Sequence, residues 1–239
     1  MKLRHLLSAA GAAVALSAAT PSLAVTITVT GAPYAPGSIF GGISVAATTF
    51  GGEAGRFAVT GFQVGSPSTA FNAFTYCVDV FTSVFTSVNY DISPLSAIGA
   101  SVDRQGRLAG LLVNSQSLLA AATTDEQRIL IGAATQVSVW ELVYENADSP
   151  LTVSSGDFSV YGDFLPDVST LANSYLANDW MAAPTLVNSL ISVDGKSQNQ
   201  IYLTAAAVPE PATWLSMVFG FGIVGSALRR RQTAKVAMI

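Results

Sequence analysis

The chain has 239 residues, of which 50% are hydrophobic and 11% are charged, so it can bury a sizeable core and is not a disordered chain. Between the two ends, five basic side chains stand against fifteen carboxylates, a net charge of −10, which argues against nucleic acid as a partner. The single histidine is His5 and the single cysteine is Cys77, which excludes Ser-His-Asp and Cys-His catalysis, zinc sites and an internal disulfide from the remaining chain.

The first residues, MKLRHLLSAAGAAVALSAATPSLAVT, place a short basic stretch before an apolar run that ends in small residues. This order is typical of a secretory signal peptide. Ser22 and Ala24 fit the small-x-small cleavage rule, so we predict a signal peptide over residues 1–24, cleaved after Ala24. The alternative is a buried N-terminal helix.

From Val25 to about Tyr90 the chain favours strands, because VTITVT alternates and later segments are rich in aromatic and β-branched residues. Two such segments are GRFAVTGFQVG and AFNAFTYCVDVFTSVFTSVNYDI. The glycine-rich segment GSIFGGISVAATTFGGEAG between the first strands predicts turns or a mobile loop.

From about Asp103 the periodicity becomes helical. The segment DRQGRLAGLLVNSQSLLAA predicts one or two helices, and TTDEQRILIGAATQVSVWELVYENADSP predicts the clearest helix of the chain. Thr123 or Thr124 can cap this helix, with Asp125 and Glu126 in its first turn and Pro150 just beyond its end.

The remaining body completes a mixed fold. LTVSSGDFSVYG predicts a strand and PDVSTLANSYLANDWMAA a helix, while TLVNSLISVDG and NQIYLTAAAV predict a hairpin that turns near Asp194-Gly195. We therefore expect an α+β fold, a β-rich sandwich-like or barrel-like domain with an inserted helical segment, over residues 25–207.

The C-terminal end has the features of a second targeting segment. Residues 212–228 contain no charge, which is about the minimum length for a membrane span, and Arg229, Arg230 and Arg231 follow directly. The order of Pro209-Glu210-Pro211, apolar helix and arginine cluster resembles the PEP-CTERM sorting signal of Gram-negative bacteria that make extracellular polysaccharide. The resemblance implies recognition by an exosortase. We assign residues 208–232 to this signal and residues 233–239 to a short cytoplasmic tail; a plain membrane anchor is the alternative.

Cys77 and the long helix suggest a reactive pair. Helical spacing places six residues of this helix on one face: Ile129, Gly132, Ala133, Gln136, Trp140 and Val143. Gln136 is the only polar side chain among them. In the strand, Tyr76 and Val78 alternate with Cys77 and Asp79. If the Tyr76 side packs into the sheet core, Cys77 faces the element that covers the other side, for which the long helix is the strongest candidate.

Two motifs carry a family resemblance. Tyr76-Cys77-Val78-Asp79, followed by Thr135-Gln136-Val137-Ser138-Val139-Trp140, resembles the thioester domain of bacterial surface adhesins, with Ser138 where that family has alanine. Glu141 follows Trp140 in a Cys-Val-Asp strand and Gln-x-x-x-Trp-Glu helix arrangement that is also similar to many PEP-CTERM proteins. The resemblance implies an internal thioester between the Cys77 sulfur and the Gln136 acyl carbon. Tyr76, Asp79, Thr135, Trp140 and Glu141 would be its supporting residues.

Other arrangements of these residues remain open. Cys77 and Gln136 can be an inert hydrogen-bonded pair or unrelated positions, and Cys77 can pair with a second chain. Asp157, Asp163 and Asp167 lack a calcium-loop spacing, so we interpret them as solvated surface. Glu141 and Glu145 are interpreted as flanking the helix end rather than as an acid/base pair. An intramolecular Lys-Asn crosslink is poorly supplied, because Lys196 is the only lysine between the two terminal targeting segments.

These features together predict an exported, non-enzymatic surface or matrix protein without a cofactor, attached to exopolysaccharide or to a neighbouring surface through the proposed thioester. Expected partners are the secretion machinery, an exosortase, the membrane as a transient anchor, and a ligand bearing an amine or hydroxyl group. The alternatives are a structural matrix protein with an inert cysteine and an enzyme that acts on polysaccharide through paired carboxylates.

Overall fold

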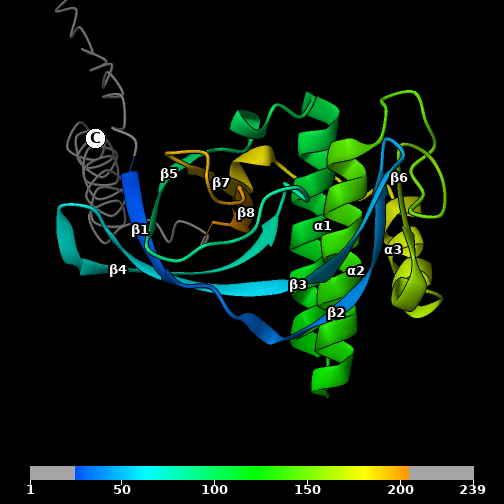
Figure 1. Cartoon of the computed structure of the whole chain (residues 1–239), viewed down its shortest axis with the longest axis horizontal. Coiled ribbons are helices and arrows are strands. Elements are labelled where there is room, and N and C mark those ends of the chain that lie inside the picture. Colours follow the sequence, from blue (N-terminus) through cyan, green and yellow to red (C-terminus); the bar gives the residue numbers. More distant parts are fainter. Residues whose placement is uncertain (1–24, 205–239) are drawn as a thin grey trace, which may run out of the picture.

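The computed structural model describes residues 25–204 (Figure 1). The predicted signal peptide with its cleavage site, the PEP motif, the apolar segment 212–228 and the arginine cluster lie outside these residues. The strands are β1 (Val25–Gly31), β2 (Tyr34–Val45), β3 (Thr48–Gln63), β4 (Ser66–Cys77), β5 (Val88–Pro94), β6 (Phe158–Tyr161), β7 (Val187–Ser192) and β8 (Gln200–Leu203). The α-helices are α1 (Val102–Ala121), α2 (Asp125–Tyr144) and α3 (Asp167–Ala177), and short 3-10 turns are η1 (Leu95–Ile98), η2 (Gly162–Phe164) and η3 (Pro184–Leu186).

All eight strands belong to one antiparallel sheet in the order β1-β5-β7-β8-β4-β3-β2-β6. An additional pairing between β1 and β3 joins the sheet to itself. Six strands, β1, β5, β7, β8, β4 and β3, therefore form a closed ring, from which β2 and β6 extend. The expected α+β class and barrel-like sheet are confirmed.

The β2–β3 hairpin corrects the expectation of turns or a mobile loop in the glycine-rich segment. Its two strands pair from Ser38 opposite Gly55 to Val45 opposite Thr48. The glycines leave space for large neighbours: the Phe164 ring lies against Gly41 and the Tyr161 ring against Gly42, where a Cβ atom would collide with them. Aromatic side chains thus cover the positions at which the strand has none of its own.

The long helix α2 begins where the sequence predicts a cap. Thr124 accepts a hydrogen bond from the Gln127 N–H, and the Gln127 side chain accepts one from the Thr124 N–H, which completes a capping box at the start of α2. Ser101 caps α1, which is a single helix. α1 and α2 stand beside the ring, next to the long β2–β3 hairpin (Figure 1).

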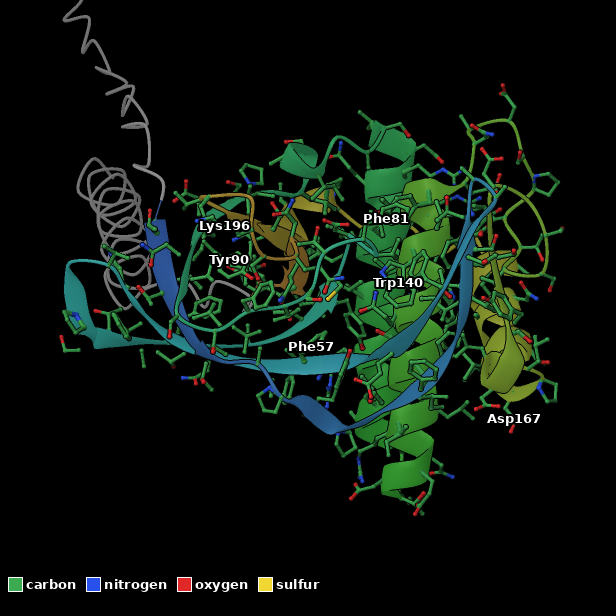
Figure 2. The ribbon with its side chains drawn as sticks, viewed as in Figure 1. Phe57, Phe81, Tyr90, Trp140, Asp167 and Lys196 are labelled. Atoms are coloured by element: carbon green, nitrogen blue, oxygen red, sulfur yellow. The ribbon has the colours of Figure 1, made fainter. Side chains whose placement is uncertain are left out.

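Two hydrophobic clusters follow from this arrangement. One lies between the sheet and the helices and includes Tyr76, Val78 and Trp140. The other is formed by residues from the strands of the ring: Ile27, Val29, Phe57, Val59, Cys77, Tyr90, Leu190 and Tyr202. Figure 2 shows Tyr90 among the ring strands and Trp140 on the helix side. Both faces of β4 are therefore buried near its C-terminal end.

The predicted strand segment that continues beyond Cys77 is interrupted. β4 ends at Cys77, and residues 78–87 form a bend before β5. Asp79 stabilises this bend, because its carboxylate accepts a hydrogen bond from the Phe81 N–H at 2.9 Å. Within residues 25–204, no helix is long and apolar enough to cross a membrane.

Candidate functional site

Cys77 and Gln136 lie in direct contact. The Cys77 N–H donates to Gln136 Oε1 at 2.9 Å, and Gln136 Nε2 donates to the Cys77 carbonyl at 2.8 Å. Both residues are buried, with exposed fractions of 2% and 1%. The fold thus brings together two residues that lie 59 positions apart in the sequence.

The contact exists because β4 loses one neighbour near its end. β3 pairs with β4 only as far as Thr75, whereas β8 pairs with β4 through Cys77. The Val78 N–H donates to Asn199 on the β8 side, so the N–H and C=O of Cys77 point to the side that β3 has left. Gln136 fills this place from α2 and satisfies both groups. A flipped amide would set donor against donor, so the complementarity fixes its orientation.

The Cys77 thiol lies on the ring side of β4. It packs in the cluster of Ile27, Phe57 and Tyr90, while Tyr76 and Val78 face the helices. The expectation that the Cys77 side of the strand would face the long helix was wrong. The alternation of side chains along a strand predicts which residues share a face. It cannot tell which face points to the helices when the sheet is closed and both faces are buried. Gln136 contacts the Cys77 backbone from beside the strand.

Burial controls the chemistry of the thiol. Desolvation raises the pKa of Cys77 well above its usual value, and the nearby Asp79 carboxylate raises it further. The group is therefore protonated and weakly nucleophilic in this state. Tyr34, on β2, also has its pKa raised, first by burial and then by the neighbouring Cys77.

The middle of α2 is buried on all sides rather than along one stripe. Every residue from Gly132 to Leu142 is buried, while Ile129 and Val143 are half-buried. Gly132 lies against the backbone of Arg56 on β3, where an added Cβ would be 3.5 Å from the Arg56 nitrogen. α2 is therefore inserted between the hairpin and the other helices, which fixes Gln136 relative to β4.

The predicted supporting residues have separate roles. Thr135 donates to the Ile131 carbonyl of its own helix at 2.7 Å. Ser138 likewise donates to Ala134, at 2.8 Å, so its hydroxyl proton is engaged. Trp140 packs near Phe158 with ring centroids 6.4 Å apart, and its indole N–H has no acceptor among residues 25–204. Only Tyr76 and Asp79, next to Cys77 in the chain, belong to the immediate surroundings of that residue.

Glu141 and Glu145 hold the loop that follows α2. Glu141 Oε1 accepts from the Thr152 N–H at 2.7 Å, and Glu145 Oε2 accepts from the Phe158 N–H at 3.2 Å. Desolvation raises the pKa of Glu141 to about 8 despite the hydrogen bond from Thr152. Neither carboxylate lines the cavity of about 570 Å³ or the cavity of about 650 Å³, and their contacts give them a structural position at the helix end.

The other acidic candidates lie on the surface. Asp157, Asp163 and Asp167 are exposed, and Asp157 accepts a hydrogen bond from Asn146. Across the described part of the chain, no three His, Cys, Asp or Glu side chains are grouped in a way that could hold a metal ion. Lys196 lies 3.6 Å from Asp194 in the β7–β8 turn.

A cavity of about 650 Å³ lies between the β2–β3 hairpin, residues 80–86 and α2, and neither Cys77 nor Gln136 lines it. Trp140, one helical turn after Gln136, forms part of its wall, together with Tyr34, Phe57 and Phe81. Among residues 25–204, Glu53 is the only charged residue that lines it. The sequence analysis missed Tyr34 and Glu53, because only the register of the β2–β3 hairpin brings them here.

The comparisons with known proteins identify the C-terminal sorting motif. The pattern of the PEP-CTERM protein-sorting motif matches residues 207–231, close to the predicted 208–232. This motif implies export, recognition by exosortase and sorting to the cell surface. No curated protein matches the sequence.

One solved structure shows a weak similarity. It is the N-terminal domain of the Streptococcus pyogenes pilus tip adhesin Cpa, with 11% identity and a TM-score of 0.37. The similarity covers 62% of this chain and 83% of that one.

Proposed function

We propose that this chain is a non-enzymatic adhesive protein of the cell surface or extracellular matrix, and that it attaches through a thioester between Cys77 and Gln136. The supporting observation is the pair of hydrogen bonds that holds the Gln136 amide against Cys77. The amide is held against the backbone of the residue that carries the thiol, so rotation of one side chain would give the proximity that an uncatalysed acyl transfer requires.

Formation of the bond is an amide-to-thioester exchange. The Cys77 sulfur attacks Gln136 Cδ, the Cδ–Nε2 bond breaks, and the thiol proton leaves with nitrogen as ammonia. The Cys77 N–H already donates to Oε1, where negative charge develops during the attack. The thiol now lies on the ring side, so the step requires rotation of the Cys77 side chain toward α2.

Attachment is the second acyl transfer. An amine or hydroxyl group of the target attacks the same carbon, the carbon–sulfur bond breaks, and the proton of the nucleophile passes to sulfur. The product is a covalent amide or ester to the target and a free Cys77 thiol. The acyl group is used once, so the protein does not turn over and needs no histidine or metal for this step.

The surroundings protect such a bond until a target arrives. Both partners are nearly inaccessible, which limits hydrolysis because water is excluded. The cavity lined by Trp140, one helical turn after Gln136, is the route that we propose for a nucleophile; side chains between it and Gln136 must move to let the nucleophile in.

The terminal segments give the route to the surface. Residues 1–24 direct export across the inner membrane of a Gram-negative bacterium, and residues 212–228 hold the chain in that membrane until exosortase acts. The body of residues 25–207 is then released or transferred to the outer surface, where the exopolysaccharide matrix of a biofilm is one target.

Intact mass spectrometry of the purified chain tests the proposal. A thioester makes the chain lighter by one ammonia molecule than its sequence mass, and methylamine adds to Gln136 while it frees the Cys77 thiol. The Cys77→Ala variant must show neither effect. A full sequence mass together with no methylamine adduct would rule out the thioester.

A structural matrix protein is the second candidate, and a specific observation favours it. Gln136 already makes a complementary pair with the Cys77 backbone, so its amide is satisfied without any reaction. In this case the Cys77 thiol is an inert core group, and the purified chain has its full sequence mass.

A further inference from the structure

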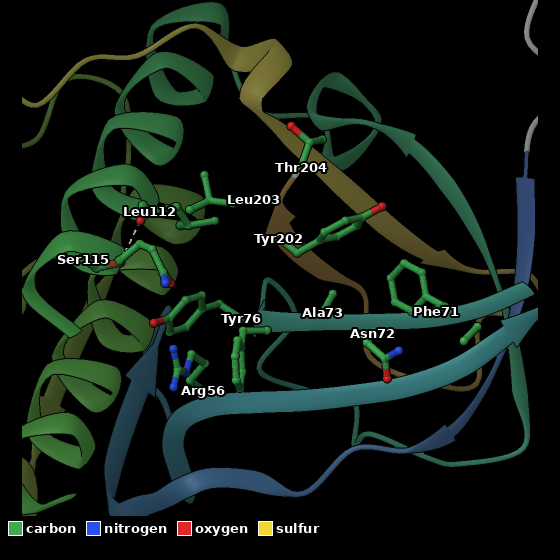
Figure 3. A pocket seen from close by; sticks show the side chains of 13 residues that line it. Arg56, Phe71, Asn72, Ala73, Tyr76, Leu112, Ser115, Tyr202, Leu203 and Thr204 are labelled. Carbon is green, nitrogen blue, oxygen red and sulfur yellow. Dashed lines mark hydrogen bonds between the residues drawn. The ribbon is translucent and has the colours of Figure 1, made fainter. Parts of the chain in front are cut away.

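A second cavity, of about 570 Å³, lies along the edge of β4 that β8 leaves open before Thr75, and is bounded by β4, β8 and α1 (Figure 3). Arg56 from β3 is the only charged residue of the described chain that lines it. The cavity differs from the one beside Trp140, with which it shares no lining residue.

Arg56 has no ionic partner. No carboxylate of residues 25–204 lies within ion-pair distance of its guanidinium, whereas Arg107 and Arg128 each pair with aspartate. Its Nε donates to the Ala35 carbonyl at 3.3 Å, and its guanidinium carbon lies 3.8 Å from the centre of the Phe74 ring. A half-buried cation with no anion is costly, so the remaining donors are available to an anionic ligand.

The Tyr76 hydroxyl is a second polar group of the cavity. Tyr76 lines the cavity with an exposed fraction of 4%, and its oxygen makes no hydrogen bond of good geometry within residues 25–204. Ser115 and Thr135 lie near it, and each donates its own proton to a carbonyl of its own helix, so their oxygens can only accept from the tyrosine. Figure 3 shows the Tyr76 hydroxyl and Arg56 next to each other at the α1 end of the cavity.

The other walls suit a ring with an apolar C–H face and hydroxyl groups around it. Phe71 and Tyr202 stand edge to face, with centroids 5.6 Å apart, along the β8 side. The side-chain amides of Asn72 and Gln116, both exposed residues, lie at the rim. An aromatic wall with a few polar groups around a charged one is the usual composition of a small-molecule site.

We propose that this cavity binds an acidic sugar, a uronic acid unit of a polysaccharide, with its carboxylate on Arg56 and Tyr76. The sugar ring then lies against Phe71 and Tyr202, and its hydroxyl groups reach Asn72 and Gln116. Binding at this site is reversible and does not involve Cys77, so it is independent of the proposed thioester.

Calorimetric titration of the purified full-length chain with oligogalacturonate, and with neutral cello-oligosaccharide as the matched uncharged probe, tests the proposal. We expect binding of the oligogalacturonate only, weakened by added salt. Arg56→Gln should reduce the affinity about tenfold or more, because a charge-assisted hydrogen bond is lost. Arg107→Gln, which removes an arginine that does not line this cavity, is the control and should leave the affinity unchanged.

Asn72→Asp provides a second variant, because this exposed residue at the rim can change without affecting the core. Its added negative charge should also weaken binding of the oligogalacturonate. Cys77→Ala should bind as the natural chain does, which separates this proposal from the thioester. Three results would each overturn the proposal. The first is equal binding of the neutral oligosaccharide, the second is undiminished binding by Arg56→Gln and Asn72→Asp, and the third is binding of poly-glutamate peptide in place of the sugar.

Discussion

The Gln136 side chain takes the place of a missing strand beside Cys77, since its amide pairs with both backbone groups of that residue. Gln136→Leu keeps the apolar volume but leaves the Cys77 N–H and C=O buried without partners. We expect it to lower the free energy of unfolding by about 2–4 kcal/mol, because each unsatisfied group costs roughly 1–3 kcal/mol. Urea denaturation of both proteins measures the difference.

The control for this substitution is Gln116→Leu, on an exposed part of α1. It should change the unfolding free energy by less than about 0.5 kcal/mol. If Gln136→Leu were equally mild, the amide–backbone pair would have no structural role.

Glu141 predicts a dependence of stability on pH. Its pKa is raised to about 8 in the folded chain from an ordinary value of 4.5, so the folded state holds a proton that the unfolded state releases between these values. Its contribution is therefore fully present below the lower pKa and is lost as the pH rises toward the upper one, by at most about 1.4 kcal/mol per pH unit.

Glu141→Gln should remove this slope, because a neutral amide oxygen can still accept from the Thr152 N–H. Urea denaturation at about pH 5 and about pH 8.5 should show the variant gaining stability relative to the natural chain at the higher pH. Glu53→Gln, at an exposed site, is the matched control. If Glu141→Gln and Glu53→Gln changed the pH dependence of the unfolding free energy equally, burial of the Glu141 carboxyl would not be its cause.

Two helical glycines predict opposite effects of the same substitution. At Gly110 on α1, an added Cβ would collide with the Trp180 backbone, so Gly110→Ala should cost roughly 1–3 kcal/mol. At Gly132 on α2 the nearest atom would lie 3.5 Å away, and Gly132→Ala should add roughly 0.5–1 kcal/mol through the higher helix propensity of alanine. Thermal unfolding of both variants gives the signs, and a stabilised Gly110→Ala would refute this packing.

The Cys77 thiol should resist alkylation in the folded chain. Its exposed fraction is 2% and burial raises its pKa, so few thiolates are available to iodoacetamide. We expect labelling to be more than about a hundredfold slower than in urea, since it depends on opening of the structure. Equal labelling rates in the folded chain and in urea would place the thiol at the surface. If the chain stays unlabelled in urea until methylamine is added, its cysteine is acylated.

The helices were predictable because their signals are local. The cap at Thr124 and the acidic first turn of α2 depend on neighbours in the sequence, and the structure follows them closely. The β7–β8 hairpin likewise forms around Asp194-Gly195, where Gly195 has a φ of 67°. Short-range chemistry is visible in one sequence without knowledge of the rest of the fold.

The glycine-rich hairpin was not predictable, because its order comes from distant side chains. Gly41 and Gly42 are packed by Phe164 and Tyr161, more than a hundred positions later, and the turn at Ala46-Ala47 has positive φ angles without the usual glycine or asparagine. The approach of Gln136 to Cys77 followed from the motif resemblance, but the direction of the thiol required knowledge that the sheet closes on itself.

The pairing of β8 with β4 has a mechanical consequence. β8 is the last strand of the described body, and its register sets Gln200 opposite Cys77. Tension applied from the C-terminal end is therefore resisted first by the hydrogen bonds that pair β8 with β7 and with residues 75–77 of β4. We predict that pulling on this end in single-molecule force measurements loosens the strand of Cys77 early, so that flow past a tethered cell acts on this cysteine; an early release elsewhere in the body would refute this load path.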